Sequence, residues 1–301
     1  MARSPHSHAR HSRSLNHLTD SRTFCREARG PDPKERASFS PALRYRELDH
    51  YSQERIVCRR NDRERYHLRQ SELYTMAEAG KFRAISIDDL EKYVYSGNRA
   101  MMVRDLSSLQ KQGLIKRSCG RYPRPVQVVT LTRQGGRFMR EVLKQSDQEI
   151  YSGLKKVREL RHDTALYEIY QAKAQEIEDA GGKIKRVILD YELKRNLNRD
   201  LKRSDDSDPS DEAALKDEIS RKHAVPVVNQ SFVVPDVRIE YEDRDGNEWR
   251  VDLEYLTETY RQGDISAKAQ AGFSLYAPHD QAPRLHRVLD QHHIMTEILS
   301  I

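Results

Sequence analysis

The amino-acid sequence predicts an α+β protein with two unlike parts: a helical domain closed by a β-hairpin, then an α/β domain with a mixed sheet. Apolar residues recur at helical spacing between about 68 and 110, and two β-branched runs joined by a Gly/Pro-rich turn follow. From about residue 160, helical and strand-like patterns alternate. The 301 residues are enough for two ordinary domains.

Charge is distributed unevenly along the chain. Residues 99–144 contain eleven Lys or Arg and two acids, a net charge of +9, whereas residues 205–218 contain seven acids and one Lys, a net charge of −6. A basic segment followed by an acidic one is typical of a nucleic-acid-binding module joined to a domain of different chemistry. Two solvated faces would have the same composition. No apolar run approaches the roughly eighteen residues of a membrane span, and the odd number of cysteines, three, favours a reducing, cytoplasmic location.

Composition also suggests the domain boundaries. Residues 1–55 are rich in Arg, His, Ser and Pro and are predicted to be a disordered basic arm, although a linker without function would look the same. A charged helical lead-in is expected at 51–70, and a helical connector at about 145–160. The other predicted units are a first domain at 60–148, a second domain at 160–280 and a C-terminal helical tail at 281–301.

The first domain is predicted to contain three helices, a hairpin and a fourth helix. Ser86 is placed to cap the second helix, and Ser96-Gly97 marks a tight break before the third, as in a helix-turn-helix. Gly113 ends the third helix. The expected helices cover residues 68–80, 86–95, 98–113 and 133–145, and the expected strands cover 114–117 and 126–132.

The third helix and the hairpin carry the residues expected to contact DNA. In the helix, Ala100, Val103, Leu106 and Leu109 should face the core, which leaves a polar face outside. A helix fits the major groove, where polar side chains read base edges, while basic residues of a neighbouring hairpin meet phosphates. The predicted DNA-binding residues are Asn98, Arg99, Arg104, Ser107 and Lys111 on the helix and Lys116, Arg117, Arg121 and Arg124 on the hairpin.

Two phrases in this segment resemble the winged helix-turn-helix family of bacterial DNA-binding proteins. SSLQKQGLIKR fits the family's L..L...GLI.R before the wing, and TLTRQGG contains the LT..G that follows it. The resemblance covers about 75 residues and implies a winged helix that binds double-stranded DNA. The same fold can also serve as a protein-docking module.

A second hairpin is predicted around an Asp245-Gly246-Asn247 turn. With a three-residue turn, one face is apolar and pairs Tyr241 with Val251, Ile239 with Leu253, and Val237 with Tyr255. The other face then has Glu240 opposite Asp252, Arg238 opposite Glu254, and Asp236 near the open end. Like charges placed opposite each other destabilise a sheet. We therefore expect either a cation at this face or an ion pair between Arg238 and Glu254.

The second domain resembles the PD-(D/E)xK nuclease fold. The resemblance rests on a helix with Glu168, the phrases VPDVRIEY and VDLEYLTE, and a later helix containing Lys268. More narrowly, His162 at the head of the first helix, the PD strand and the LTE ending resemble replication-relaxation proteins of plasmids and integrated elements, which also place a winged helix first.

The resemblance implies a metal-dependent catalytic site. In an active member of the fold, Asp236 and Asp252 would ligate Mg²⁺, Glu168 would assist, and a lysine would polarise the attacking water. Here Glu254 stands at the lysine position, so catalysis would need Glu254 itself or Lys268 in that role. The alternative is an inactive nuclease fold kept as a DNA clamp or a partner-binding platform.

Three functional hypotheses follow. The first is a DNA-binding protein of a plasmid or mobile element that acts in replication, relaxation or mobilisation, with a nuclease-like domain that is inactive or weakly active. The second is a Mg²⁺-dependent endonuclease targeted by its winged helix, and the third is a transcriptional regulator. The expected partners are double-stranded DNA, a second copy of the chain and other replication or mobilisation proteins, without a membrane.

Overall fold

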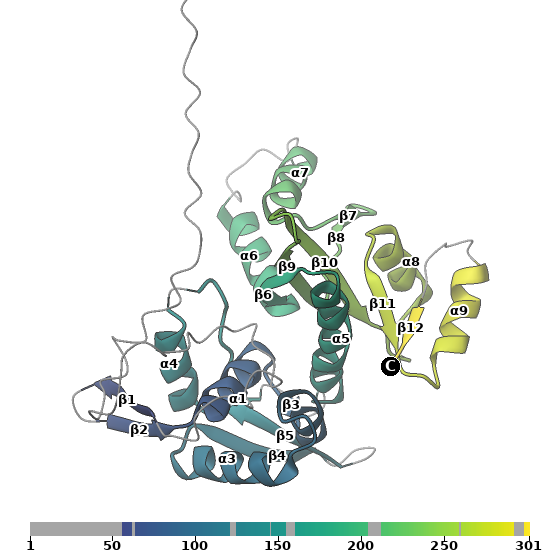
Figure 1. Cartoon of the computed structure of the whole chain (residues 1–301). Helices are drawn as coiled ribbons and strands as arrows, with labels where there is room; N and C mark the ends of the chain where they lie inside the picture. The colour runs from purple at the N-terminus through teal and green to yellow at the C-terminus, as the bar shows by residue number, and fades with distance from the viewer. Residues whose placement is uncertain are drawn as a thin grey trace, which may run out of the picture.

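A computed structural model of the chain describes residues 56–61, 64–120, 125–144, 146–154, 160–203, 212–258, 260–291 and 298–301. The arm predicted for residues 1–55 lies outside this range, as do Arg121 and Arg124 of the predicted hairpin. The described chain is mixed α+β, as predicted, and its largest sheet is mixed parallel and antiparallel (Figure 1).

The first part consists of a hairpin, a three-stranded antiparallel sheet and the helices around it. Strand β5 lies between β3 and β4 in that sheet. The elements are β1 (Ile56–Asn61), β2 (Glu64–Leu68), α1 (Gln70–Lys81), β3 (Ile85–Ser86), α2 (Ile87–Asp89), the π-helical turn η3 (Leu90–Val94), α3 (Arg99–Lys111), β4 (Ile115–Gly120), β5 (Val126–Leu131) and α4 (Arg133–Val142).

The helical lead-in predicted for residues 51–70 is wrong, because the described part of it forms the hairpin β1–β2. Tyr66 and Leu68 are buried while His67 between them is exposed, which is the two-residue period of a strand. The side-chain amide of Gln112 completes this strand. Its Nε2 donates to the His67 carbonyl and its Oε1 accepts from the His67 N–H, each at 3.1 Å.

The break before α3 forms as predicted. The hydroxyl of Ser86 accepts a hydrogen bond from the Asp89 N–H at 2.9 Å and caps α2. Ser96 and Gly97 then adopt positive φ values of 48° and 82°, which turns the chain sharply. The Asn98 side chain accepts from the Met101 N–H at 3.0 Å and starts α3.

The predicted core face of α3 is partly wrong. Leu106 and Leu109 are buried, but Val103 is 46% exposed and Ala100 is also exposed. Met102 and Asp105 face inward instead. The positions 102, 105, 106 and 109 also lie on one side of a helix, because they are spaced by three, one and three residues. The acidic residue among them concealed this pattern, because a buried carboxylate requires partners that the sequence does not reveal.

The LT..G phrase has a direct structural cause. The Thr132 hydroxyl donates to the Gly113 carbonyl at 2.6 Å and accepts from the Gly135 N–H at 3.0 Å, so one side chain joins the end of α3 to the start of α4. A Cβ atom on Gly135 would lie 2.0 Å from the carbonyl oxygen of Leu114. Only glycine allows the two backbones to approach this closely.

The second part is built on a five-stranded sheet in the order β12-β11-β10-β9-β6. Strands β6, β9 and β10 are antiparallel neighbours, and β11 and β12 add in parallel. The elements are α5 (Leu160–Asp179), β6 (Lys183–Leu189), α6 (Asp190–Arg203), α7 (Glu212–His223), β7 (Val227–Val228), β8 (Ser231–Phe232), β9 (Val237–Glu242), β10 (Glu248–Tyr255), α8 (Gln262–Gln270), β11 (Ser274–Ala277), α9 (Ala282–Gln291) and β12 (Ile298–Ser300).

The C-terminal end departs from the predicted helical tail at 281–301. Helix α9 is present, but the chain returns as β12 and extends the sheet beside β11. Before α9, the segment SLYA forms β11, because a short, mostly buried apolar run suits a strand with both faces covered.

The predicted hairpin register is also wrong, by two residues. Ile239 lies opposite Val251 and Val237 opposite Leu253, while Asp252 lies opposite Arg238 rather than Glu240. The turn is longer than three residues, because the carboxylate of Asp243 accepts hydrogen bonds from the N–H groups of residues 245 and 247 and organises a five-residue loop. A shift of two residues keeps each side chain on its predicted face.

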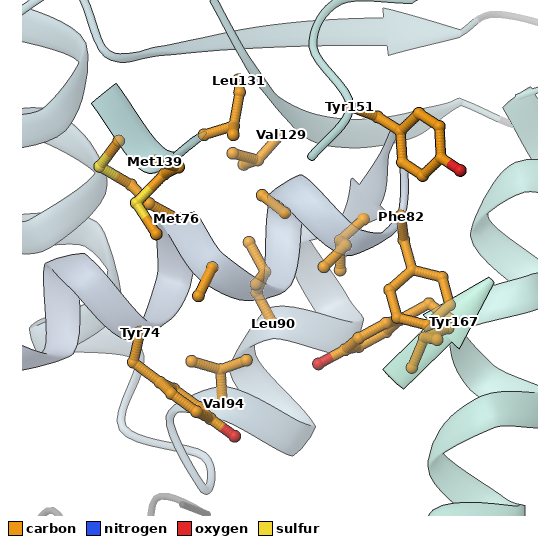
Figure 2. Packing of buried hydrophobic residues seen from close by; sticks show 14 of the residues in the cluster. Tyr74, Met76, Phe82, Leu90, Val94, Val129, Leu131, Met139, Tyr151 and Tyr167 are labelled. Atoms are coloured by element: carbon orange, nitrogen blue, oxygen red, sulfur yellow. The ribbon is translucent and has the colours of Figure 1, made fainter. Parts of the chain in front are cut away.

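The two parts share one hydrophobic cluster, which lies along α5. The Phe82 ring lies 5.1 Å from the Tyr167 ring and 4.9 Å from the Tyr170 ring, and Figure 2 shows Phe82 beside Tyr167. At the same boundary the Glu78 carboxylate accepts from the Lys81 ammonium at 2.6 Å and from the Tyr167 hydroxyl at 3.2 Å.

The helical connector expected at 145–160 is wrong as well, because residues 146–154 contain no helix. This segment bonds to both parts instead. Tyr151 N–H donates to the Gly80 carbonyl at 2.8 Å, and Gly153 N–H to the Leu131 carbonyl at 2.9 Å. The Gln148 amide bonds to both backbone groups of Val187.

We predict that Gly135→Ala lowers the free energy of unfolding by about 3 kcal/mol, since the added methyl overlaps the Leu114 carbonyl. Gly263→Ala in α8 is the matched control. Nothing lies within 4 Å of a Cβ there, so removing a helical glycine should stabilise the chain by up to about 1 kcal/mol. Urea denaturation of the full chain measures both changes. Equal effects of the two substitutions would contradict the close approach.

Candidate nucleic-acid interface and carboxylate site

The outer face of α3 is basic and has no exposed acid. Arg99 and Lys111 are exposed at its two ends. Its one acid, Asp105, is fully buried, where it accepts from the Arg69 guanidinium at 3.0 Å and from the Ser71 hydroxyl. The negative charge of α3 itself is therefore inside the protein and neutralised.

The predicted DNA-binding residues of α3 differ in how available they are. The Arg99 side chain is 67% exposed and forms an ion pair with Glu91. The Nε of Arg104 lies 3.1 Å from Asp105, so this residue helps to hold the buried carboxylate. Two other side chains bond to the backbone of the helix itself. Asn98 caps its N-terminus by accepting from the Met101 N–H, and Ser107 donates to the Val103 carbonyl.

Lys116 and Arg117 add two exposed cations on β4, with side chains on opposite faces of the strand. Both are exposed, and β4 follows α3 after the tight turn at Gly113, which has φ +70°. Figure 1 shows α3 and β4 next to each other at one end of the first part. The exposed cations of α3 and of β4 therefore lie near one another at this end of the first part.

In the second part, Glu254 is the centre of a carboxylate site. It is fully buried on β10. Its Oε1 accepts from the Lys268 ammonium of α8 at 2.7 Å and from the Tyr260 hydroxyl at 2.6 Å, and its Oε2 accepts from the Asp236 N–H at 3.1 Å. Burial and the nearby charge of Asp236 raise the pKa of Glu254 above its ordinary value, which Lys268 opposes.

Asp236 joins this site from the residue before β9. Its Oδ2 accepts from the Tyr255 N–H at 3.0 Å and lies 3.2 Å from Nε2 of His162 at the start of α5. Burial alone would lower the pKa of His162, but its interactions with Asp163 and Asp236 outweigh burial and raise the pKa to about 10. His162 is therefore a cation at neutral pH.

Asp252, predicted to ligate a metal with Asp236, is not part of this site. The buried Arg238 binds it bidentately, with Nε 2.7 Å from Oδ1 and Nη2 2.8 Å from Oδ2. The same guanidinium donates to the carbonyls of His223 and Ala224 and so ties the end of α7 to the sheet. The expected partner of Arg238 was Glu254. The corrected register explains why Arg238 pairs with Asp252 and not with Glu254, because Asp252 is the residue directly opposite Arg238.

Glu168 is also outside the hydrogen bonds and ion pairs that join the described residues of this site. Burial is the main cause that raises the pKa of Asp89 to about 6, and the charge of Glu168 adds to it. After burial, the charge of Glu168 is also a cause of the raised pKa of Tyr255. The Tyr255 side chain lies on the opposite face of β10 from Glu254. Of the five predicted catalytic residues, the structure brings together Asp236, Glu254 and Lys268 and leaves out Glu168 and Asp252.

These residues do not fit a Mg²⁺ site. Mg²⁺ prefers carboxylate and water oxygens in octahedral geometry. Here both carboxylate oxygens of Asp252 accept from Arg238, and both oxygens of Glu254 accept from protein donors. Within the part of the chain that the structure describes, no group of three or more His, Cys, Asp or Glu side chains is arranged to hold a metal ion.

Two residues near the site were not predicted. Tyr260 contacts Glu254 from the loop after β10, and no periodic pattern marks that position. Lys194 lies one turn into α6, where burial lowers its pKa, but the ion pair with Asp190 and the charges of Asp236 and Glu254 raise it overall. In the sequence, Asp190, Glu192 and Lys194 have the composition of a charged start of a helix.

Comparisons of the chain with protein families, curated proteins and solved structures return no match. Among the described helices, none has the length and apolar character needed to cross a membrane.

We predict that Arg238→Met lowers the free energy of unfolding by about 3–5 kcal/mol, because it leaves the Asp252 carboxylate buried without its partner. The double variant Arg238→Met/Asp252→Leu should recover most of this loss. Lys216→Met breaks an exposed pair with Glu212 and should cost less than about 1 kcal/mol. Denaturant titrations of the three proteins measure the changes. A double variant no more stable than Arg238→Met would refute the pairing.

A second prediction concerns pH. The folded chain raises the pKa of His162 from 6.5 to about 10, so it binds the proton more tightly than the unfolded chain does. The stability from this group should be complete below pH 6.5 and disappear as the pH rises toward 10. The stability difference between the wild type and His162→Asn, measured by urea denaturation, should therefore be larger at pH 6 than at pH 9.5. A difference independent of pH would contradict the charged pair with Asp236.

Proposed function

We propose that this chain is a DNA-binding protein of a plasmid or mobile element, acting in DNA replication, relaxation or mobilisation. In this proposal α3 enters the major groove and β4–β5 lies along the backbone. The observation that carries the proposal is the basic outer face of α3 and β4, from which the one acid of the helix, Asp105, is turned inward and paired.

The order of elements in the first part supports a winged helix-turn-helix. Helix α1, strand β3, α2 with η3, then α3 and the antiparallel pair β4–β5 follow one another as the resemblance implies. The left-handed residues Ser96 and Gly97 separate the second and third helical segments. The attribution to replication-relaxation proteins rests on the sequence resemblance.

The second part supports a nuclease-like scaffold. Helix α5, the antiparallel strands β9 and β10, and helix α8 occur in the order that the PD-(D/E)xK resemblance implies. Because Arg238 and Lys268 neutralise the carboxylates, we propose that this part acts as a clamp or platform. The second candidate is a metal-dependent endonuclease, favoured by the meeting of Asp236, Glu254 and Lys268 at one place.

For DNA binding, we predict that Lys111→Ala and Lys116→Ala each weaken affinity for all duplexes alike and reduce the slope of log K against log salt by about 1. Arg99→Ala should cost about 1–3 kcal/mol on a preferred sequence and less on others. The full chain is required, since the two parts share one core. Lys216→Ala on α7 is the control for loss of charge alone. Absence of salt-dependent binding to any duplex would refute the proposal.

The two candidates for the second part are separated by incubating supercoiled plasmid with the full chain and Mg²⁺ or Mn²⁺, beside Asp236→Ala. We expect no nicking by either protein, because the carboxylates already have protein partners. Metal-dependent nicking by the wild type that is lost in Asp236→Ala would establish the endonuclease instead.

A further inference from the structure

Helix α3 exposes two aliphatic side chains in the middle of its basic face. Val103 is 46% exposed, one of three exposed large hydrophobic residues in the described chain, and Ala100 is exposed beside it. Their spacing of three residues places them on the same side of the helix. An apolar spot on the face proposed to enter DNA requires a specific explanation.

The surroundings of this spot favour a polyanion that carries an apolar group. Arg99 precedes Ala100, Lys111 lies two turns beyond Val103, and no acid of the helix is exposed. The hydroxyl of Ser107 donates its proton to the Val103 carbonyl, so this proton is not available to a base next to Val103. In the major groove, the apolar group presented by the base pairs is the C5 methyl of thymine.

The dimensions of the helix limit the number of bases involved. A rise of about 1.5 Å per residue separates Ala100 and Val103 by about 4.5 Å along the axis, close to the roughly 3.4 Å between successive base pairs. The two side chains can therefore meet one thymine, or two on adjacent base pairs. Gln110 is exposed about two turns further on and can address a different base pair.

We propose that Ala100 and Val103 determine sequence specificity by contacting the C5 methyl of one or two adjacent thymines in the DNA target. This inference rests on the proposed DNA-binding function. Burial of one methyl group contributes about 0.8 kcal/mol, which corresponds to about a fourfold change in affinity.

The test first selects a preferred duplex from a randomised pool with the full chain. Each thymine is then replaced by deoxyuridine, which pairs identically but lacks the methyl group. We expect Kd to rise about fourfold at one or two adjacent positions and to stay constant elsewhere. A 5-methylcytosine–guanine pair at the same position should retain more affinity than the unmethylated cytosine–guanine pair.

Two variants identify the side chain that contacts the thymine methyl group. Val103→Ala shortens an exposed side chain without disturbing the core and should remove most of the sensitivity to deoxyuridine. Lys111→Ala, the matched control, should weaken binding to both duplexes equally and keep the sensitivity. Tight binding by the wild type that ignores deoxyuridine at every position, or full sensitivity in Val103→Ala, would overturn the inference and leave the proposed function intact. Loss of all duplex binding would refute the proposed function itself.

A second copy of the chain is the competing occupant of this spot. Light scattering of the wild type and Val103→Lys separates the two explanations. The same mass for both proteins supports DNA as the occupant. A dimeric wild type that becomes monomeric in Val103→Lys would overturn the inference, because the aliphatic residues would then form a protein interface.

Discussion

The packing of α5 between the two parts is the constraint on which the rest of the structure depends. Tyr167 is fully buried, and its ring meets Phe82 while its hydroxyl reaches Glu78 of α1. The other side of α5 covers the apolar face of β9 and β10, where Ile239 and Leu253 are inaccessible to solvent. Because one helix completes the core of both parts, α3 and the five-stranded sheet are held in a defined relative orientation.

Buried charge shapes both candidate sites in the same manner. Asp105 is neutralised by Arg69, and Glu254 by Lys268, with hydroxyl donors from Ser71 and Tyr260 completing each set. A buried carboxylate without such partners would be strongly destabilising. In the first part this pairing leaves an outer face without exposed acid. In the second part it occupies the oxygens that a divalent cation would need.

Much of the fold could be predicted from local signals. The Ser86 cap and the Ser96-Gly97 break form as expected, because each depends on neighbouring residues. The faces of the second hairpin were also predictable, since side chains alternate along a strand. Its register was not, because the Asp243 side chain decides the turn length. The pairing of Arg238 with Asp252 follows from that register. Two partners of Asp105, Ser71 and Arg69, lie 34 and 36 residues away in the sequence.

Leu160 lies between the β4–β5 hairpin and the carboxylate site around Asp236 and Glu254. Its side chain would lie 2.7 Å from a Cβ on Gly120, at the end of β4, and His162, two residues further along α5, meets Asp236. If α3 and β4 hold a defined sequence of DNA, the site around Asp236 stays at a constant separation from that sequence. The second part would then lie at a fixed distance along the duplex from the sequence that α3 binds.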